Sequence, residues 1–557
     1  KELIRTAHNQ NYEVTASGGN ERTTFYASLG FNRQEGLVEN SNLDRYSARL
    51  NMTHKIGSRV EVGGNMMFTQ ISQEMNEERG SNINPFLCVA VSATPSMPVR
   101  DVSGNYVGSY AGTNVNPLRD IRTDYNRSRM TRMFSTGYAS VDIIKGLKLK
   151  ETLSYDYTVQ KDSRYLNPLS GAGPKSGSDA QTSKGFTEYG KLLSSTSLNY
   201  THTFAAKHHL DILAAYELES YQSDKAMGEK AKLPSDVLLE PDNAAVLKSF
   251  VSSTQAYRMI SYLSRLNYDY DNRYYIAGSY RRDGSSRLAP ESRWGDFWSV
   301  SGMWHLSSEP FMEAVKPVLN DVKIRASYGV LGEELGTALS HIVGYNYNDG
   351  GAVIDGGLVT GSTVTGLATD NITWGKSKIL NIGIDLGFLD NRLNASFDYF
   401  NRDQTGLLAS RYDVQIPEEV GFSLPQENLN SNYARGFDAS VNWRDRIGDV
   451  NYTVGGNVTY SRWYVGDRYK PRFSSEWQKF RYQAGNITGR YTDVEFSLVS
   501  DGQFQSWEEI ANHPIDQDHQ GNITLKPGDA KYKDMNGDGL INDAVWRAIV
   551  YRKGGTP

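Results

Sequence analysis

The feature that most constrains this chain is a two-residue alternation of apolar and polar side chains, repeated along most of its length. The run LNIGIDLGF at 380–388 is the clearest case, and 25–31, 46–53 and 60–69 follow the same pattern. Because successive strand side chains point to opposite faces, each segment predicts a strand with one apolar and one polar face. About sixteen such segments, each of roughly ten residues, precede Tyr460. That length suits a tilted strand that crosses a membrane.

The connections between these segments alternate between short and long. The short ones are Gly18-Gly19-Asn20, Ile56-Gly57-Ser58, Lys145-Gly146, Ala205-Ala206-Lys207, Asp271-Asn272 and Asp390-Asn391. The long, polar ones cover about 71–129, 160–190, 220–256, 330–377 and 402–433. An outer-membrane barrel has short periplasmic turns and long extracellular loops. The sequence therefore predicts an all-β, antiparallel, up-and-down transmembrane barrel.

Composition agrees with this fold and excludes others. Mean hydropathy is −0.54 and no run of eighteen apolar residues occurs, which excludes a helical membrane protein. The 35 tyrosines suit strands and the boundary between lipid and water. A net charge of −5 gives no basic field for nucleic acid. Cys88 is the single cysteine, so no disulfide framework is expected.

Two regions depart from the alternating pattern. Residues 307–321 contain Pro310 and Pro317 and could form a helical turn within a short-side link. After Tyr460 the alternation fades, and residues 462–557 are polar. We expect residues 1–461 to form the barrel and 462–557 to form one long extracellular loop region.

No catalytic residue is predicted. Gly375-Lys376-Ser377 resembles the end of a phosphate-binding loop, but the earlier glycine of that loop is replaced by Asp370. His202, His208 and His209 flank one predicted turn, where surface histidines are expected. No pair of carboxylates has the spacing of an acid and base, and nucleophile-elbow and dinucleotide fingerprints are absent.

One motif has metal chemistry. The run DMNGDGLIN at 534–542 follows the pattern of a calcium loop, in which oxygens converge on a hard cation. The predicted ligands are Asp534, Asn536, Asp538, the Leu540 carbonyl and Asn542. Gly539 allows the sharp turn, and Ile541 would anchor the loop to a core. The position of the usual closing carboxylate is Val545. The alternative is an Asx-rich turn that needs no ion, so no cofactor is required and calcium is the one candidate.

Several short motifs, in order along the chain, resemble those of the SusC/RagA family of TonB-dependent transporters. They are 281–287 (RRDGSSR), 293–295 (RWG), 299–301 (SVS), 309–312 (EPFM), 323–329 (KIRASYG), 381–385 (NIGID), 391–393 (NRL) with Asp398-Tyr399, 435–438 (RGFD), and 527–529 (PGD) with 534–539 (DMNGDG). The resemblance covers nearly the whole chain.

The resemblance implies a barrel of about 22 strands, of which this chain supplies about sixteen. It also implies a plug domain, a TonB box and an N-terminal extension, all expected outside this sequence. The implied partners are a SusD-like surface lipoprotein that lids the barrel, TonB, and outer-membrane lipid, with no nucleic acid. The implied location is the outer membrane of a Gram-negative, Bacteroidota-like cell, crossed many times. The implied cargo is a glycan or oligopeptide.

Three alternatives remain at this stage. The first is a siderophore or cobalamin receptor of the same fold, which the family motifs disfavour. The second is a surface adhesin or glycan-binding protein that transports nothing. The third is a secreted all-β enzyme, which the lack of a catalytic constellation disfavours.

Overall fold

The computed structural model describes most of the chain. The described residues are 2–76, 98–107, 116–168, 179–335, 341–411, 414, 416–417, 419, 421–469, 489, 491–492, 495–535, 537–542 and 547–549. Among them no helix is long and apolar enough to cross a membrane.

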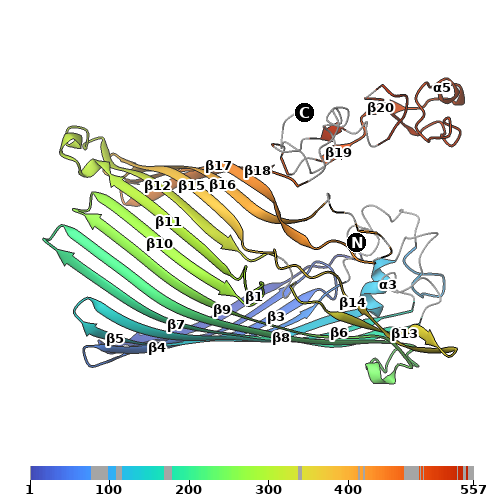
Figure 1. The fold of residues 1–557 in the computed structure, drawn as a ribbon, viewed down its shortest axis with the longest axis horizontal. Coiled ribbons are helices and arrows are strands. Elements are labelled where there is room, and N and C mark those ends of the chain that lie inside the picture. Colours follow the sequence, from blue (N-terminus) through green and yellow to red (C-terminus); the bar gives the residue numbers. More distant parts are fainter. Residues whose placement is uncertain are drawn as a thin grey trace. The chain divides into compact units, whose positions relative to one another are not determined.

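Sixteen antiparallel strands are hydrogen-bonded in chain order, from β1 to β18 (Figure 1). They are β1 (Asn9–Gly19), β2 (Thr23–Glu35), β3 (Asn42–Ile56), β4 (Val60–Glu74), β5 (Tyr125–Ile144), β6 (Leu147–Leu166), β7 (Gln181–Phe204), β8 (His208–Ala231), β9 (Val246–Tyr270), β10 (Tyr274–Ser285), β11 (Trp294–His305), β12 (Leu319–Glu333), β15 (Gly375–Phe388), β16 (Leu393–Ser410), β17 (Gln426–Ile447) and β18 (Val450–Val465). The predicted up-and-down all-β topology is confirmed.

The chain divides into two compact units. The first contains residues 1–200 and 213–262, and the second contains 201–212 and 263–557. In the first unit, Leu3, Val38, Leu118 and Ile121 form a small buried core. The helix α3 (Pro117–Thr123) supplies two of these side chains, and Asn116 caps it by accepting a bond from the Arg119 N–H at 3.4 Å. This core lies on the side of the predicted long loops.

The predicted tight turns connect the strands. Ala205 and Ala206 have φ of 51° and 56°, and Asp271 and Asn272 have φ of 54° and 56°. Two consecutive residues with positive φ match the right-handed twist of a β-hairpin. In the predicted helical link, the 3₁₀ turns η3 (Leu306–Ser308) and η4 (Pro310–Met312) lie between β11 and β12.

The strands are longer than predicted. β7 and β8 each have 24 residues and β9 has 25, so these strands continue into the predicted long connections. The expected strand length of about ten residues was therefore wrong for them. The alternation marks only the part of a strand that has one apolar face, whereas ladder hydrogen bonds continue where both faces are polar.

One hairpin was not predicted. In the link between β12 and β15, β13 (Tyr345–Ile354) pairs with β14 (Gly357–Val364). Asp355 and Gly356 form its turn with φ of 51° and 78°. An Asp-Gly pair between apolar residues is a strong hairpin signal, so the sequence did contain this information.

The region after β18 has a different construction. β18 continues to Val465, past the point where the alternation fades. Beyond it lie the helix α5 (Trp507–Ala511) and two small sheets, β19 (Glu495–Ser497) with β22 (Arg547–Ile549) and β20 (Ser500–Gln503) with β21 (Ala530–Tyr532). Phe504, Ile510 and Ile541 are buried within this region. Its extracellular location stays a prediction.

Candidate functional site

The two faces of the second unit's sheet differ in chemistry. Ile382 is 48% exposed and Phe397, on the neighbouring strand, is 45% exposed. The residues between the apolar positions of β15 lie on the other face, where Asp385 bonds to Arg325 and Asn381 lines a groove. One face is therefore an exposed apolar wall, and the other is polar and internally hydrogen-bonded.

Arg325 on β12 is the centre of the polar face. Its guanidinium donates to both carboxylate oxygens of Asp385 at 2.8 and 2.9 Å, and to both of Asp398 at 3.0 Å. Gly383, which pairs with Arg325 and with Asp398, makes this arrangement possible. A Cβ at Gly383 would lie 2.4 Å from the Asp398 carboxylate and 2.9 Å from the guanidinium. The glycine of the NIGID motif thus leaves room for a double bidentate ion pair.

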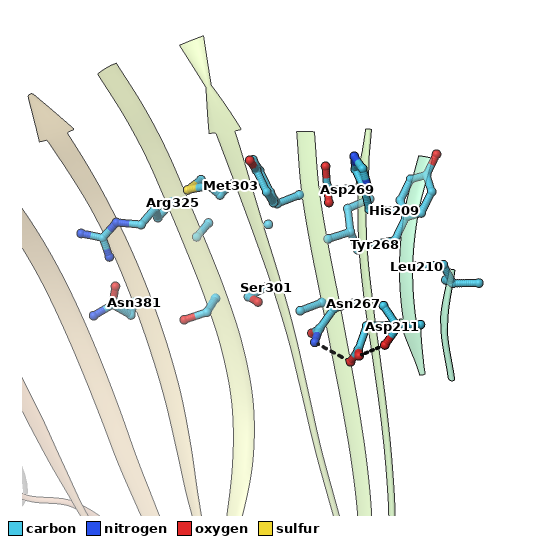
Figure 2. A pocket seen from close by; sticks show the side chains of 17 residues that line it. His209, Leu210, Asp211, Asn267, Tyr268, Asp269, Ser301, Met303, Arg325 and Asn381 are labelled. Atoms are coloured by element: carbon cyan, nitrogen blue, oxygen red, sulfur yellow. Dashed lines mark hydrogen bonds between the residues drawn. The ribbon is translucent and has the colours of Figure 1, made fainter. Parts of the chain in front are cut away.

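A groove of about 440 Å³ lies on this polar face, beside Arg325 (Figure 2). Short runs of consecutive residues from neighbouring strands line it, and they combine polar side chains with apolar surface. The main polar contributors are His209, Asp211, Asn267, Asp269, Tyr275, Ser301, Arg325, Ser327 and Asn381.

Hydrogen bonds fix part of the groove's lining. Asp211 accepts from the Thr201 hydroxyl at 2.9 Å and from the Asn267 amide at 3.3 Å (Figure 2). The Arg265 guanidinium lies 3.4 Å from the same carboxylate. The three predicted surface histidines lie on β7 and β8, and they divide between the two faces of these strands. His208 bonds to the Tyr268 hydroxyl at 2.7 Å, whereas His209 bonds to the Thr203 hydroxyl at 2.9 Å and lines the groove.

The RRDGSSR and RWG motifs meet at the loop end of the same unit. Ser285 is fully buried, and its hydroxyl bonds to Glu334, which also pairs with Arg287 at 3.3 Å. The Trp374 indole donates to the Arg293 carbonyl at 3.0 Å. These contacts tie the β10–β11 hairpin to the link between β12 and β15. In the sequence these two motifs are evident only as a family resemblance, and the structure gives them a physical role.

In the calcium-like loop, two carboxylates bond to the loop's own backbone. Asp534 accepts from the N–H groups of Gly537 at 2.7 Å and Gly539 at 2.8 Å, and Asp538 accepts from Leu540 at 2.9 Å. Gly537 and Gly539 have φ of 79° and 80°.

The same loop is fixed to its surroundings as predicted. Ile541 is 7% exposed, and its N–H donates to the Asp516 carbonyl at 3.1 Å. Asn536 and Val545 lie outside the described residues. In the described part of the chain, no group of three or more His, Cys, Asp or Glu gathers around a metal position. The predicted set relies on amide and carbonyl oxygens as well as two carboxylates, so the metal site stays a prediction.

Comparison with known proteins identifies the family. A family model described as TonB dependent receptor-like, beta-barrel, matches residues 90–547. A TonB-dependent receptor of Formosa agariphila is 26% identical and aligns with 96% of this chain and 52% of its own length. The TonB-dependent receptor SusC of Bacteroides thetaiotaomicron is 24% identical, with 97% of this chain and 56% of the relative aligned. This chain thus spans about half the length of the curated relatives that it matches.

Solved structures agree on the fold. The RagAB peptide importer in its closed-closed state has a TM-score of 0.76 at 22% identity. The alignment covers 98% of this chain and 59% of the importer chain. The Escherichia coli ferric-catecholate receptor Fiu has a TM-score of only 0.51 at 12% identity. The chain therefore belongs to the TonB-dependent receptor-like β-barrel family, and it is similar to SusC in sequence and to the RagAB peptide importer in fold.

Proposed function

We propose that this chain forms the barrel wall and outer loops of an outer-membrane transporter that imports glycans or oligopeptides. The observation that carries the proposal is the contrast between the two faces of the β10–β18 wall. Lipid requires an exposed apolar face, which Ile382 and Phe397 provide. A hydrophilic cargo requires donors and acceptors along its path, which Arg325, Ser327 and Asn381 provide.

We propose that a SusD-like surface lipoprotein covers the loop end and that TonB supplies the energy. The support is the membership of the TonB-dependent receptor-like family, the motifs that resemble those of the SusC/RagA group, and the similarity to SusC and the RagAB peptide importer. We further propose that a plug domain rests on the polar face around Arg325. A hydrogen-bonded, polar contact suits two parts that separate and rejoin, because transient interfaces are more polar than permanent ones.

Uptake by intact cells tests the cargo. Cells that express the full-length protein, and cells that lack its gene, are incubated with labelled oligosaccharide and labelled oligopeptide pools. We expect one pool to enter only when the gene is present, and uptake to stop when a protonophore removes the proton-motive force. Entry of a ferric siderophore or cobalamin instead would support the first alternative. Surface binding without entry, unaffected by the protonophore, would support the adhesin.

We propose that residues 462–557 lie outside the cell and contact the lid. The loss of alternation after Tyr460 and the small separate core at Phe504, Ile510 and Ile541 support this. Protease added to intact cells should cut within this region and spare Asp271-Asn272. Cleavage at Asp271-Asn272 with protection of 462–557 would reverse the topology.

We propose a structural calcium ion in the 534–542 loop, held by Asp534, Asn536, Asp538, the Leu540 carbonyl and Asn542. The turn geometry at Gly537 and Gly539 supports it. An ion there would fix the shape of a polar loop and reduce the entropy lost when a partner docks. We propose no catalytic role for any residue of the chain.

A further inference from the structure

The link between β11 and β12 differs from the other connections at the same end of the second unit. There the chain turns tightly at Asp271-Asn272, at Asp390-Asn391 and at Gly448-Asp449. The β11–β12 link instead covers Leu306–Val318, with the sequence LSSEPFMEAVKPV and two 3₁₀ turns. Reversing the chain between two antiparallel strands does not need so many residues. The length of this segment therefore indicates an additional role.

Several hydrogen bonds hold this segment in place. Ser307 is buried, and its hydroxyl accepts from the Val322 N–H at 3.1 Å. Glu309 accepts from the Tyr274 hydroxyl at 2.6 Å and the Trp304 indole at 3.1 Å. The far end of the segment is fixed by the Leu389 N–H, which donates to the Val318 carbonyl at 2.9 Å.

This fixed segment exposes an apolar stripe. Phe311 is 65% exposed, Val315 44% and Val318 59%. The spacing of these residues is i, i+4 and i+7, which places them on one side of a helical turn. Backbone bonds from Lys316 to Met312 at 3.1 Å and from Leu319 to Val315 at 2.8 Å show that the backbone does turn helically here. Exposed apolar side chains that share one side of a hydrogen-bonded segment indicate a contact surface.

The stripe continues the apolar wall. Tyr274 and Trp304 lie on the same face as Ile276 and Ile324, and are 43% and 37% exposed. Their rings stack at 6.4 Å, and Tyr270 stacks on Tyr274 at 6.4 Å. Tyr and Trp gather where acyl chains meet headgroups, because their rings are apolar and their tips polar. Glu309 binds both polar tips, so the stripe begins where this aromatic row ends.

We propose that Leu306–Val318 is an interfacial anchor, with Phe311, Val315 and Val318 inserted at the boundary between headgroups and acyl chains of the leaflet at the short-turn end. An amphipathic turn with an apolar face of this kind lies in the plane of the interface. The occupant is lipid because the stripe is continuous with the wall that faces lipid. The inference rests on the proposed function in one respect, that the β10–β18 wall is embedded in a bilayer.

Site-specific quenching tests the anchor in the full-length transporter, reconstituted in phosphatidylethanolamine–phosphatidylglycerol vesicles. Cys88 is replaced by serine, and a single cysteine is placed at Phe311, Val315 or Val318 and labelled with an environment-sensitive fluorophore. Glu313, which is exposed on the same segment but off the stripe, is the matched control. We expect spin-labelled lipid to quench the three stripe labels several-fold more than the Glu313 label, and iodide in the buffer to do the reverse.

A label at Ile382 separates the two ways to fail. If the Ile382 label is quenched by lipid and the stripe labels are quenched only by iodide, the anchor is wrong and the barrel stands. Stripe labels shielded from both quenchers would mean that a protein covers the stripe, which also overturns the anchor. If the Ile382 label is itself quenched only by iodide, the wall does not face lipid and the proposed function fails.

Discussion

The β10–β18 wall and the region 495–542 belong to the same unit, but their sequences specify structure by different means. In the wall, alternation fixes which side chains share a face, and register then brings distant residues together. Arg325, for example, meets Asp385 and Asp398, which are 60 and 73 residues away. The ladder hydrogen bonds themselves do not depend on side-chain type.

In the region 495–542 the side chains bond directly to nearby backbone. Asp518 accepts from the N–H groups of Gln520, Asn522 and Thr524, each at 2.8 Å. Such bonds replace regular ladders, around the small core that contains Phe504. Alternation therefore predicts the wall, while only local motifs predict the other region. The effect of a substitution in the wall should therefore depend on which face of the sheet carries the side chain. In the region 495–542 it should depend on which hydrogen bond is lost.

The largest effect is expected from placing a charge on the apolar face. Ile384→Arg should reduce assembly strongly, because a cation at the middle of the lipid face costs about 2–4 kcal/mol. The neighbouring Asp385→Asn should be tolerated, because Arg325 keeps its bonds to Asp398. Heat-modifiable mobility of the full-length protein in outer-membrane fractions measures assembly. Equal behaviour of the two variants would mean that the faces are assigned the wrong way round.

A smaller effect is expected from the ion-pair centre. Arg325→Leu leaves Asp385 and Asp398 without their shared cation. The Arg325 side chain is 34% exposed, so solvent moderates the repulsion and we expect a loss of about 1–2 kcal/mol. Arg325→Lys should recover only part of it, because an ammonium cannot bond bidentately to both carboxylates. Urea unfolding of the full-length protein in detergent gives the difference. Identical stabilities for Arg325→Leu and the parent would show that the cluster contributes nothing.

The strands, their order and the tight turns could be read from the sequence because alternation and turn residues are local signals. The ends of the strands could not be read from it. β9 extends over 25 residues, and nothing in its polar part distinguishes a strand from a loop. The β13–β14 hairpin was missed although Asp355-Gly356 signals it, because a long polar stretch was interpreted as a single loop.

The polar groove could not be predicted, although its residues could be placed on one face. Its lining comes from β7, β8, β9, β10, β11, β12 and β15, and the grouping depends on register between strands far apart in sequence. The helical turn at 307–321 was predicted from its two prolines. The hydrogen bonds that anchor this turn to Tyr274 and Trp304 were not predicted. No local pattern in the sequence relates Glu309 to aromatic residues on two strands.

In the region 495–542 we expect a dependence on pH at Asp518. Desolvation acts to raise the pKa of this carboxyl, but hydrogen bonds from Thr524, Gln520 and Asn522 outweigh it and hold the pKa well below its usual value. Because the pKa of Asp518 is lower in the folded chain, its ionised carboxylate stabilises the fold at pH values above the pKa in the unfolded chain, which is about 3.9. This contribution is lost progressively as the pH falls toward the lower pKa of the folded chain.

Hydrogen exchange of the 515–525 segment tests this, with rates corrected for the intrinsic effect of pH. The parent should be protected at pH 7 and pH 5, and should begin to lose protection at pH 3, with further loss at lower pH. Asp518→Asn should be less protected at pH 7 and should change little with pH. A parent segment whose corrected exchange is the same at all three values would remove Asp518 as the organising group.

The smallest effect is expected from calcium at the 534–542 loop. The loop pattern provides two carboxylates, Asp534 and Asp538, and has Val545 where a bidentate carboxylate usually closes the site. With one charge and two oxygens fewer, affinity should lie in the weak extracellular range, at Kd of about 10⁻⁴ to 10⁻³ M. At about 1 mM calcium, such a site stabilises the folded loop by only about 0.4–1.4 kcal/mol. The backbone bonds that Asp534 accepts from Gly537 and Gly539 keep the turn formed without the ion. Calcium should therefore tighten the loop rather than create it.

Calorimetric titration of the full-length protein, with Asp538→Ala as the variant and Asp501→Ala as a matched control outside the loop, measures this. We expect Asp538→Ala to lose one weak site and Asp501→Ala to keep it. If both variants bind as the parent does, the motif is an Asx-rich turn, and the shape of this loop depends only on its own hydrogen bonds.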